Sequence, residues 1–206
     1  MSQGRFVSLE GGEGVGKSTQ LASLAEALRS RGRDVLTTRE PGGSPGAEAI
    51  RSLLLGGASD RWNMRAEALL FAAARADHIE KTILPALAAG RWVLSDRFLD
   101  SSLAYQGGAG GLGIEAVRAL HRFGSEDFLP DRTLVLLLPE GQERARLRDG
   151  GGSDRIGGRD QSYHQAVTAA FAAIAEAEAE RVRLVDASGA ADVVTGRLLA
   201  ELEDLA

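Results

Sequence analysis

The residues with the clearest chemical pattern run from Gly11 to Ser18 and read GGEGVGKS. They complete the pattern G-x-x-x-x-G-K-[ST], in which a glycine-rich loop points successive backbone N–H groups at a phosphate. Lys17 is expected to reach the β and γ phosphates of a nucleotide, and Ser18 to hold the Mg²⁺ that bridges them. The residues expected to bind the nucleotide are Gly11, Gly12, Glu13, Gly14, Val15, Gly16, Lys17, Ser18 and Thr19.

This loop alone does not define the reaction, because GTPase switches, motor ATPases and kinases all use it. A GTPase is disfavoured because no N-K-x-D or T-K-x-D segment that would read guanine is present. Three alternatives remain open from the loop: a kinase for a nucleotide, a kinase for another small acceptor such as a deoxynucleoside, and a nucleotide-dependent switch that acts on a partner protein.

The elements around the loop alternate between strand-like and helix-like segments. Short apolar runs predict strands at Phe6–Leu9, Asp34–Thr38, Trp92–Ser95, Thr133–Leu138 and Val182–Val185. Leucine and alanine at helical spacing predict helices at Lys17–Leu28, Ala47–Leu55, Arg65–Ala89, Ile114–Phe123, Tyr163–Glu180 and Ala191–Leu205. This alternation predicts an α/β fold with a mostly parallel sheet covered by helices on both faces. Two glycine-rich stretches, Gly107–Gly113 and Gly150–Gly158, are expected to be loops.

Composition narrows the class of protein further. The chain has 206 residues, 44% of them hydrophobic, which fits a single domain with a sizeable core. A formal net charge of −5 argues against binding duplex DNA or an anionic membrane. There is no cysteine for a disulfide or a thiolate metal site, and we find no apolar signal segment or membrane span. A cytoplasmic enzyme is expected, with no nucleic acid or membrane partner.

Charged residues follow two of the predicted strands. Arg39 comes after Asp34–Thr38, and Asp96 and Arg97 come at the end of the run that starts at Trp92. Ligands of open α/β sheets bind at the carboxyl ends of strands, where each arginine could fork onto a phosphate. Asp96 has the position of a carboxylate that helps to hold Mg²⁺. The alternative is that both arginines form surface salt bridges.

Further motifs carry a resemblance to a known family. They are TREPGGS (Thr38–Ser44), LLFAAARADH (Leu69–His78), SDRFLDSSLAYQGG (Ser95–Gly108), RARLR (Arg144–Arg148) and DRI (Asp154–Ile156). In this order and spacing they closely resemble thymidylate kinase, from about Phe6 to Ser188. The resemblance implies the P-loop nucleoside monophosphate kinase fold, with a five-stranded parallel sheet flanked by helices and a lid at about residues 141–160. It also implies a homodimer that transfers phosphate from ATP to dTMP, giving ADP and dTDP.

The resemblance also assigns the acceptor site. Phe71 and Arg75 lie four residues apart on one helix face, so the ring could stack on thymine while the guanidinium donates to a carbonyl. On spacing alone, Phe71 would more commonly be a core residue, and Pro41 a simple turn residue. The substrate-binding residues implied by the resemblance are Glu13, Arg39, Pro41, Phe71, Arg75, Arg97, Ser102, Tyr105 and Gln106. Glu13 would accept a hydrogen bond from the sugar 3′-hydroxyl, and Tyr105 would crowd the 2′ position.

The arginine that stabilises the transition state is expected to come from the lid. Some thymidylate kinases carry an arginine inside the phosphate loop, but no arginine lies between Gly11 and Lys17 here. The chain therefore resembles the bacterial type, whose lid supplies this residue. Such an arginine accelerates transfer by about 10³ to 10⁵. We favour Arg148 and Arg155 over Arg144, Arg146 and Arg159, and with Lys17, Arg97 and Asp96 they complete the predicted catalytic set.

Overall fold

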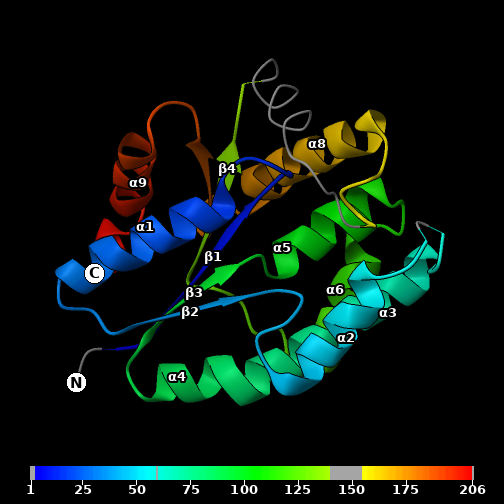
Figure 1. Ribbon diagram of the computed structural model, residues 1–206, viewed down its shortest axis with the longest axis horizontal. Coiled ribbons are helices and arrows are strands. Elements are labelled where there is room, and N and C mark those ends of the chain that lie inside the picture. The colour runs from blue at the N-terminus through cyan, green and yellow to red at the C-terminus, as the bar shows by residue number, and fades with distance from the viewer. Residues whose placement is uncertain (1–2, 59, 140–154, 206) are drawn as a thin grey trace.

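The computed structural model describes residues 3–58, 60–139 and 155–205 (Figure 1). Its five strands are all parallel and form one sheet of order β2-β3-β1-β4-β5. The strands are β1 (Arg5–Gly11), β2 (Val35–Arg39), β3 (Trp92–Asp96), β4 (Arg132–Leu137) and β5 (Val182–Asp186). The predicted α/β fold with five parallel strands is therefore confirmed.

Neighbouring residues of the central strands supply the two sides of the core. Phe6, Val93 and Val135 belong to one buried cluster, whereas Val7, Leu94 and Leu134 belong to another. Successive side chains of a strand point to opposite faces, so each apolar run fills two layers at once. This is why the predicted strands read as continuous hydrophobic segments.

Helices cover both faces of the sheet, as Figure 1 shows. Helix α1 (Lys17–Ser30) packs against α9 (Ala191–Ala200) over the face that carries Val7 and Leu9. The other helices are α2 (Pro45–Leu55), α3 (Met64–His78), α4 (Leu84–Ala88), α5 (Leu99–Ser102), α6 (Ile114–Ser125) and α8 (Gln161–Ala177), with a 3₁₀ turn at Glu203–Leu205. Among the described residues, none of these helices is both long and apolar enough to cross a membrane.

Two predictions about local structure need correction. The stretch Arg65–Ala89, expected as one helix, is continuous but contains a π-helical turn, η1, at Ile79–Ile83. The stretch Gly107–Gly113, expected as a loop, begins inside a second π-helical turn, η2 (Leu103–Ala109). A Cβ on Gly108 would lie 2.7 Å from the Ala170 side chain, so glycine permits close packing of η2 on α8 rather than loop freedom.

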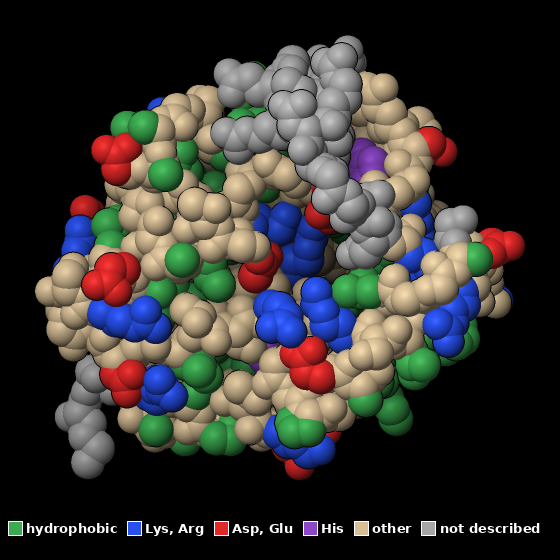
Figure 2. Space-filling view, viewed as in Figure 1, with side chains coloured by type: hydrophobic (Ala, Val, Ile, Leu, Met, Phe, Trp, Pro, Cys, Tyr) green, Lys and Arg blue, Asp and Glu red, His purple; other side chains and the backbone are tan. Residues whose placement is uncertain are grey.

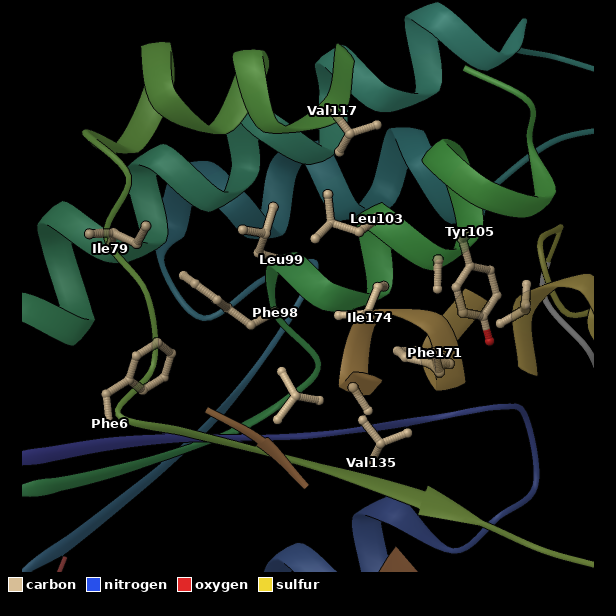
Figure 3. Close-up of a cluster of buried hydrophobic side chains, with 14 of the residues drawn as sticks. Phe6, Ile79, Phe98, Leu99, Leu103, Tyr105, Val117, Val135, Phe171 and Ile174 are labelled. Atoms are coloured by element: carbon tan, nitrogen blue, oxygen red, sulfur yellow. The ribbon is translucent and has the colours of Figure 1, made fainter. Parts of the chain in front are cut away.

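The segment α5–η2 is anchored in the core that Figure 3 displays. Leu99, Leu103 and Tyr105 from this segment are buried with Phe171 of α8 and Phe6 of β1. The segment directly follows β3, so this packing fixes the residues after Asp96 relative to the phosphate loop. It therefore positions four of the predicted acceptor residues, Arg97, Ser102, Tyr105 and Gln106.

Candidate active site

A cleft with a volume of about 460 Å³ opens at the carboxyl ends of β1, β2 and β3. Figure 2 shows Lys and Arg side chains gathered around a hollow near the middle of this face. The cleft is lined by parts of the phosphate loop and by residues from β2 to η2. Predicted site residues that line it are Glu13, Gly14, Gly16, Lys17, Ser18, Thr19, Arg39, Pro41, Phe71, Arg75, Asp96, Arg97, Ser102, Tyr105 and Gln106.

The phosphate loop has the backbone geometry that its glycines predict. Gly11, Gly14 and Gly16 all have positive φ, and a Cβ on Gly11 would lie 2.5 Å from the carbonyl oxygen of Leu136. The loop curls around Lys17, whose Nζ donates to the carbonyl oxygens of Gly11 at 3.2 Å and Gly12 at 2.7 Å. The loop thus holds its lysine at the floor of the cleft.

The electrostatic environment changes the acidity of Lys17. Burial lowers the pKa of its ammonium, Arg97 lowers it further, and nearby carboxylates offset this only in part, so the pKa falls to about 8. A negatively charged phosphate would relieve both unfavourable effects. The buried lysine is therefore suited to bind a polyanion.

Ser18 and Asp96 meet at the predicted magnesium position. Ser18 Oγ donates to Asp96 Oδ2 at 2.8 Å, although the residues come from α1 and β3. A hydroxyl and one carboxylate are hard oxygen ligands, and Mg²⁺ commonly binds one or two carboxylates together with substrate phosphates. This donor set fits magnesium bound jointly with a nucleotide.

Arg97 is held in an uncommon backbone conformation. Its φ is 71°, in the left-handed region. The backbone on both sides is fixed, because Arg97 N–H donates to Leu9 O at 2.9 Å and Ser95 Oγ donates to Arg97 O at 2.7 Å. Non-glycine residues persist in this region only where the surroundings over-determine them, commonly at functional sites. This conformation turns the side chain back across β1 toward the phosphate loop.

The guanidinium of Arg97 contacts both sides of the cleft. Nη1 donates to Gly11 O at 3.1 Å and to Ser101 Oγ at 3.0 Å. Nη2 donates to Glu13 Oε1 at 2.5 Å and to the Tyr105 hydroxyl at 3.3 Å. Arg97 therefore links the loop expected to bind the donor to the segment expected to bind the acceptor.

Glu10 supports this arrangement, and the sequence patterns did not identify it. Its Oε1 accepts from Phe98 N–H at 2.7 Å, and its Oε2 accepts from Ser101 Oγ at 2.5 Å. Burial raises the pKa of Glu10 to about 8, aided by the nearby Asp100 and opposed by hydrogen bonds and Arg97. The only sequence signal was its place at the end of a buried strand, just before the loop.

The expected base pocket lies beside Arg75. This buried side chain donates from Nε to Glu40 Oε2 at 2.8 Å and from Nη2 to Ser102 Oγ at 2.7 Å and Phe98 O at 3.2 Å. Phe71 precedes it by one helical turn and lies partly buried at the cleft wall. Pro41, after a cis peptide bond with Glu40, also lines the cleft.

Glu40, which contacts Arg75, and His78, which contacts Glu40, were also not identified as site residues from the sequence. Glu40 Oε1 lies 3.1 Å from His78 Nδ1, and His78 Nε2 lies 2.7 Å from Thr38 Oγ1. Glu40 and His78 are buried. The sequence placed both inside family motifs, in REPGG and ARADH, but gave no sign that they meet. Together they fix the guanidinium of Arg75.

The other arginines of the cleft are held by local contacts. Arg39 Nη2 donates to both carboxylate oxygens of Glu48, at 2.9 and 3.1 Å, and its side chain is largely exposed. Arg51, which the sequence analysis missed, donates to Pro41 O at 2.6 Å and lines the cleft. The Arg39–Glu48 ion pair is exposed and therefore weak enough to exchange for a phosphate.

Only two of the five predicted lid arginines lie in the part of the chain that the structure describes. Arg144, Arg146 and Arg148 lie outside the described residues. Arg155 is described, and its buried side chain donates to Leu54 O at 2.9 Å and to Glu67 Oε2 at 2.5 Å. Arg159 also donates to Glu67 Oε2, at 2.7 Å. Here Arg155 contacts α2 and α3, and its catalytic role stays a prediction.

The strand order, the phosphate loop after β1 and a cation-lined pocket beside it define a P-loop nucleoside monophosphate kinase. The family model for thymidylate kinase matches residues 9–197 of the chain. The chain belongs to the thymidylate kinase family, whose members phosphorylate dTMP to dTDP using ATP and Mg²⁺.

Individual relatives agree with this assignment. The chain is 61% identical to a thymidylate kinase of Rhizorhabdus wittichii, over 98% of both chains. It is 48% identical to one of Caulobacter vibrioides, over 96% of this chain and 95% of the relative. A crystal structure of thymidylate kinase from Ehrlichia chaffeensis matches with a TM-score of 0.80 at 27% identity, over 97% of this chain and 99% of the other. The resemblance read from the sequence motifs is therefore confirmed.

Proposed function

We propose that this cleft phosphorylates dTMP by direct in-line transfer from ATP, which feeds dTTP synthesis in the cytoplasm. The observation that carries the proposal is that one cleft joins the phosphate loop to Phe71, Arg75 and Arg97. A phosphate-binding loop, an aromatic face and two forked cations in one site match the two polyanions and the flat base of the reactants.

The chemistry requires positioning rather than a covalent enzyme intermediate. An oxygen of the dTMP phosphate attacks the γ-phosphorus of ATP, while the bond from that phosphorus to the β,γ-bridging oxygen breaks and ADP leaves. Lys17 binds the β and γ phosphates, and Arg97 brings the acceptor phosphate into line. Ser18 and Asp96 would hold Mg²⁺, which would supply positive charge to offset the charge on the transferring group.

The acceptor phosphate would displace the ion pairs that now occupy the arginines. Arg97 exchanges its contact with Glu13 for the phosphate, and Arg39 exchanges Glu48 in the same way. Glu13, once released, accepts a hydrogen bond from the sugar 3′-hydroxyl. The Tyr105 ring lies beside Arg97, with the guanidinium carbon 5.0 Å from the ring centre, and would crowd a 2′-hydroxyl.

The base would lie against Phe71 with its edge toward polar side chains. Arg75, fixed by Glu40, donates to a thymine carbonyl, and Ser102 and Gln106 contact the edge of the ring. Pro41 closes the pocket beside the base. A lid arginine, Arg148 or Arg155, would reach the transferring phosphoryl group when both substrates are bound.

We also propose that the chain forms a homodimer through α3 and α6. These helices pack against each other, and large apolar side chains point away from both. Phe123 of α6 is 93% exposed and Leu69 of α3 is 56% exposed. Apolar groups exposed this far lose contact with water when a second copy covers them.

A coupled assay of ADP release tests the proposed function. The acceptors are dTMP, dUMP, dCMP, AMP and shikimate, each titrated at saturating magnesium and ATP. We expect the highest kcat/KM for dTMP. A better acceptor among the others would identify a different kinase, and nucleotide binding with no acceptor turnover would favour a switch protein.

A further inference from the structure

Glu67 is a buried carboxylate on which three polar side chains from two other segments converge. Its Oε1 accepts from Gln106 Nε2 of η2 at 2.9 Å. Its Oε2 accepts from Arg155 Nη2 at 2.5 Å and from Arg159 Nη2 at 2.7 Å. Glu67 itself is fully buried in the first turn of α3. Burying a carboxylate is costly unless it is paired and hydrogen-bonded. The three donors therefore stabilise the buried Glu67 only in an arrangement that keeps these contacts.

The position of Glu67 on α3 connects it to the base pocket. Residues four apart lie on one face of a helix, so Glu67, Phe71 and Arg75 form a row along the same side. Phe71 and Arg75 line the cleft, as does Gln106. Glu67 therefore lies one turn behind the residue expected to stack on the base, and it holds a neighbour at the base edge.

The contact with Glu67 determines which end of the Gln106 amide faces the cleft. Two guanidinium groups donate to Glu67, which serves as an acceptor only, so Gln106 must present its NH₂ group to it. The carbonyl oxygen of Gln106 is then left for another partner. Within residues 3–58, 60–139 and 155–205, no donor reaches that oxygen. An oriented carbonyl of this kind accepts from a ring N–H and opposes a ring acceptor.

We propose that Glu67 is a positioning residue that makes the cleft select bases with an N–H at ring position 3. The proposal rests on the dTMP kinase function above. Thymine and uracil carry a hydrogen at this nitrogen, whereas cytosine presents a lone pair there. A fixed Gln106 carbonyl would accept from the first two and repel the third. Discrimination of this kind is strong because a mismatched edge leaves buried polar groups unpaired.

The same carboxylate ties the segment before α8 to the acceptor site. Arg159 also donates to the Tyr163 hydroxyl, which in turn donates to Tyr105 O at 2.7 Å. Loss of Glu67 would leave the buried guanidinium of Arg155 and the partly buried one of Arg159 without their shared anion, so part of any effect would be structural. A useful test must separate this general loss from a change in base selection.

The test compares three acceptors with Glu67→Gln, Gln106→Ala and the double variant. A glutamine at position 67 can donate or accept, so it no longer fixes the Gln106 amide. We expect the dTMP to dCMP ratio of kcat/KM to fall at least tenfold, while the dTMP to dUMP ratio changes less than twofold. In the Gln106→Ala background, Glu67→Gln should change the dTMP to dCMP ratio no further. If dCMP turnover is too slow to measure, the inhibition constant Ki of dCMP in competition with dTMP is measured in place of its kcat/KM.

Two controls keep the outcome decisive. Glu67→Asp keeps the charge for the arginines but shortens the reach to Gln106, so it should give the same loss of dCMP discrimination if Glu67→Gln does not fold. Glu26→Gln, on the exposed side of α1, should change neither ratio. Equal losses for all three acceptors, or additive effects in the double variant, would overturn the proposal. Failure of the wild type to prefer dTMP would instead refute the proposed function.

Discussion

The guanidinium of Arg97 donates to the Glu13 carboxylate at 2.5 Å, which joins the strand β3 side of the cleft to the phosphate loop. Burial raises the pKa of Glu13, but Arg97 and Lys17 outweigh it, so the pKa lies below its usual value. Both residues are assigned to the acceptor, one to its phosphate and one to its 3′-hydroxyl. Before the acceptor binds, each residue of the pair neutralises the charge of the other and holds it in place. The acceptor then replaces Glu13 as the partner of Arg97.

Replacing Arg97 should mainly weaken acceptor binding. Arg97→Lys keeps the charge but loses the fork that spans Gly11, Ser101, Glu13 and Tyr105. We expect KM for dTMP to rise by about 10- to 100-fold with a smaller change in kcat, measured by ADP release. Arg31→Ala, on an exposed side chain just after α1, serves as the control and should match the wild type. An unchanged KM for dTMP would contradict the assignment.

The pH dependence of ATP use should report the acidity of Lys17. In the enzyme without bound nucleotide, the pKa of Lys17 is lowered to about 8. Its ammonium group, which binds phosphate, is therefore present below this pH and lost above it. We expect kcat/KM for ATP to be flat below about pH 7 and to fall about tenfold per pH unit well above pH 8. Bound phosphate retains the proton, so kcat should fall less. A Lys17→Arg variant, although slower, should show no such decline, and a flat wild-type profile up to pH 10 would refute the shift.

Local patterns were enough to predict the backbone geometry of the phosphate loop. The phosphate loop depends on eight consecutive residues, and their glycine conformations follow from the spacing alone. Arg39 and Arg97 could be predicted because both follow strands of a parallel sheet. These predictions need only the local chain and the general rule that ligands lie at strand ends.

The supporting carboxylates could not be predicted in this way. Glu10, Glu40 and Glu67 each contact residues that are distant in the sequence, such as Phe98, Arg75 and Gln106. A buried carboxylate produces no periodic pattern in the sequence. Its role depends on which hydrogen-bond donors the fold brings close to it. The π-helical turn at Leu103–Ala109 was missed for a related reason, since its Gly108 permits close packing against α8.

The two favoured lid arginines should separate by kinetics and stability. Arg148→Ala is expected to lower kcat by about 10³-fold or more with little change in either KM, because a transition-state contact is lost. Arg155→Ala removes a buried partner of Glu67 and should also lower the free energy of unfolding by roughly 3 kcal/mol. Single-turnover kinetics and urea unfolding check these outcomes, with Arg31→Ala as the control. Full kcat in both variants would show that another residue stabilises the transition state.

Glu10 should make the folded protein less stable as pH rises. Its pKa is raised to about 8 on folding, so the folded state holds a proton that the unfolded chain loses near pH 4.5. The stability that this proton provides is present below about pH 4.5 and is lost as pH rises through 8. Glu10→Gln resembles the protonated form, so its unfolding free energy relative to wild type should increase by roughly 2–4 kcal/mol between pH 5 and 8. Urea unfolding across this range measures it, and a difference independent of pH would contradict it.

The proposed homodimer predicts that single charges on α3 and α6 will separate the subunits. Phe123→Asp and Leu69→Asp each place a carboxylate where the second copy would cover an apolar side chain, and removing one buried charge from water costs several kcal/mol. Sedimentation velocity at micromolar concentration should show a dimer for the wild type and monomers for both variants. Leu184→Asp is the matched control, because Leu184 is 46% exposed but lies on the edge strand β5. A monomeric wild type, or dimers in all variants, would place the interface elsewhere or exclude it.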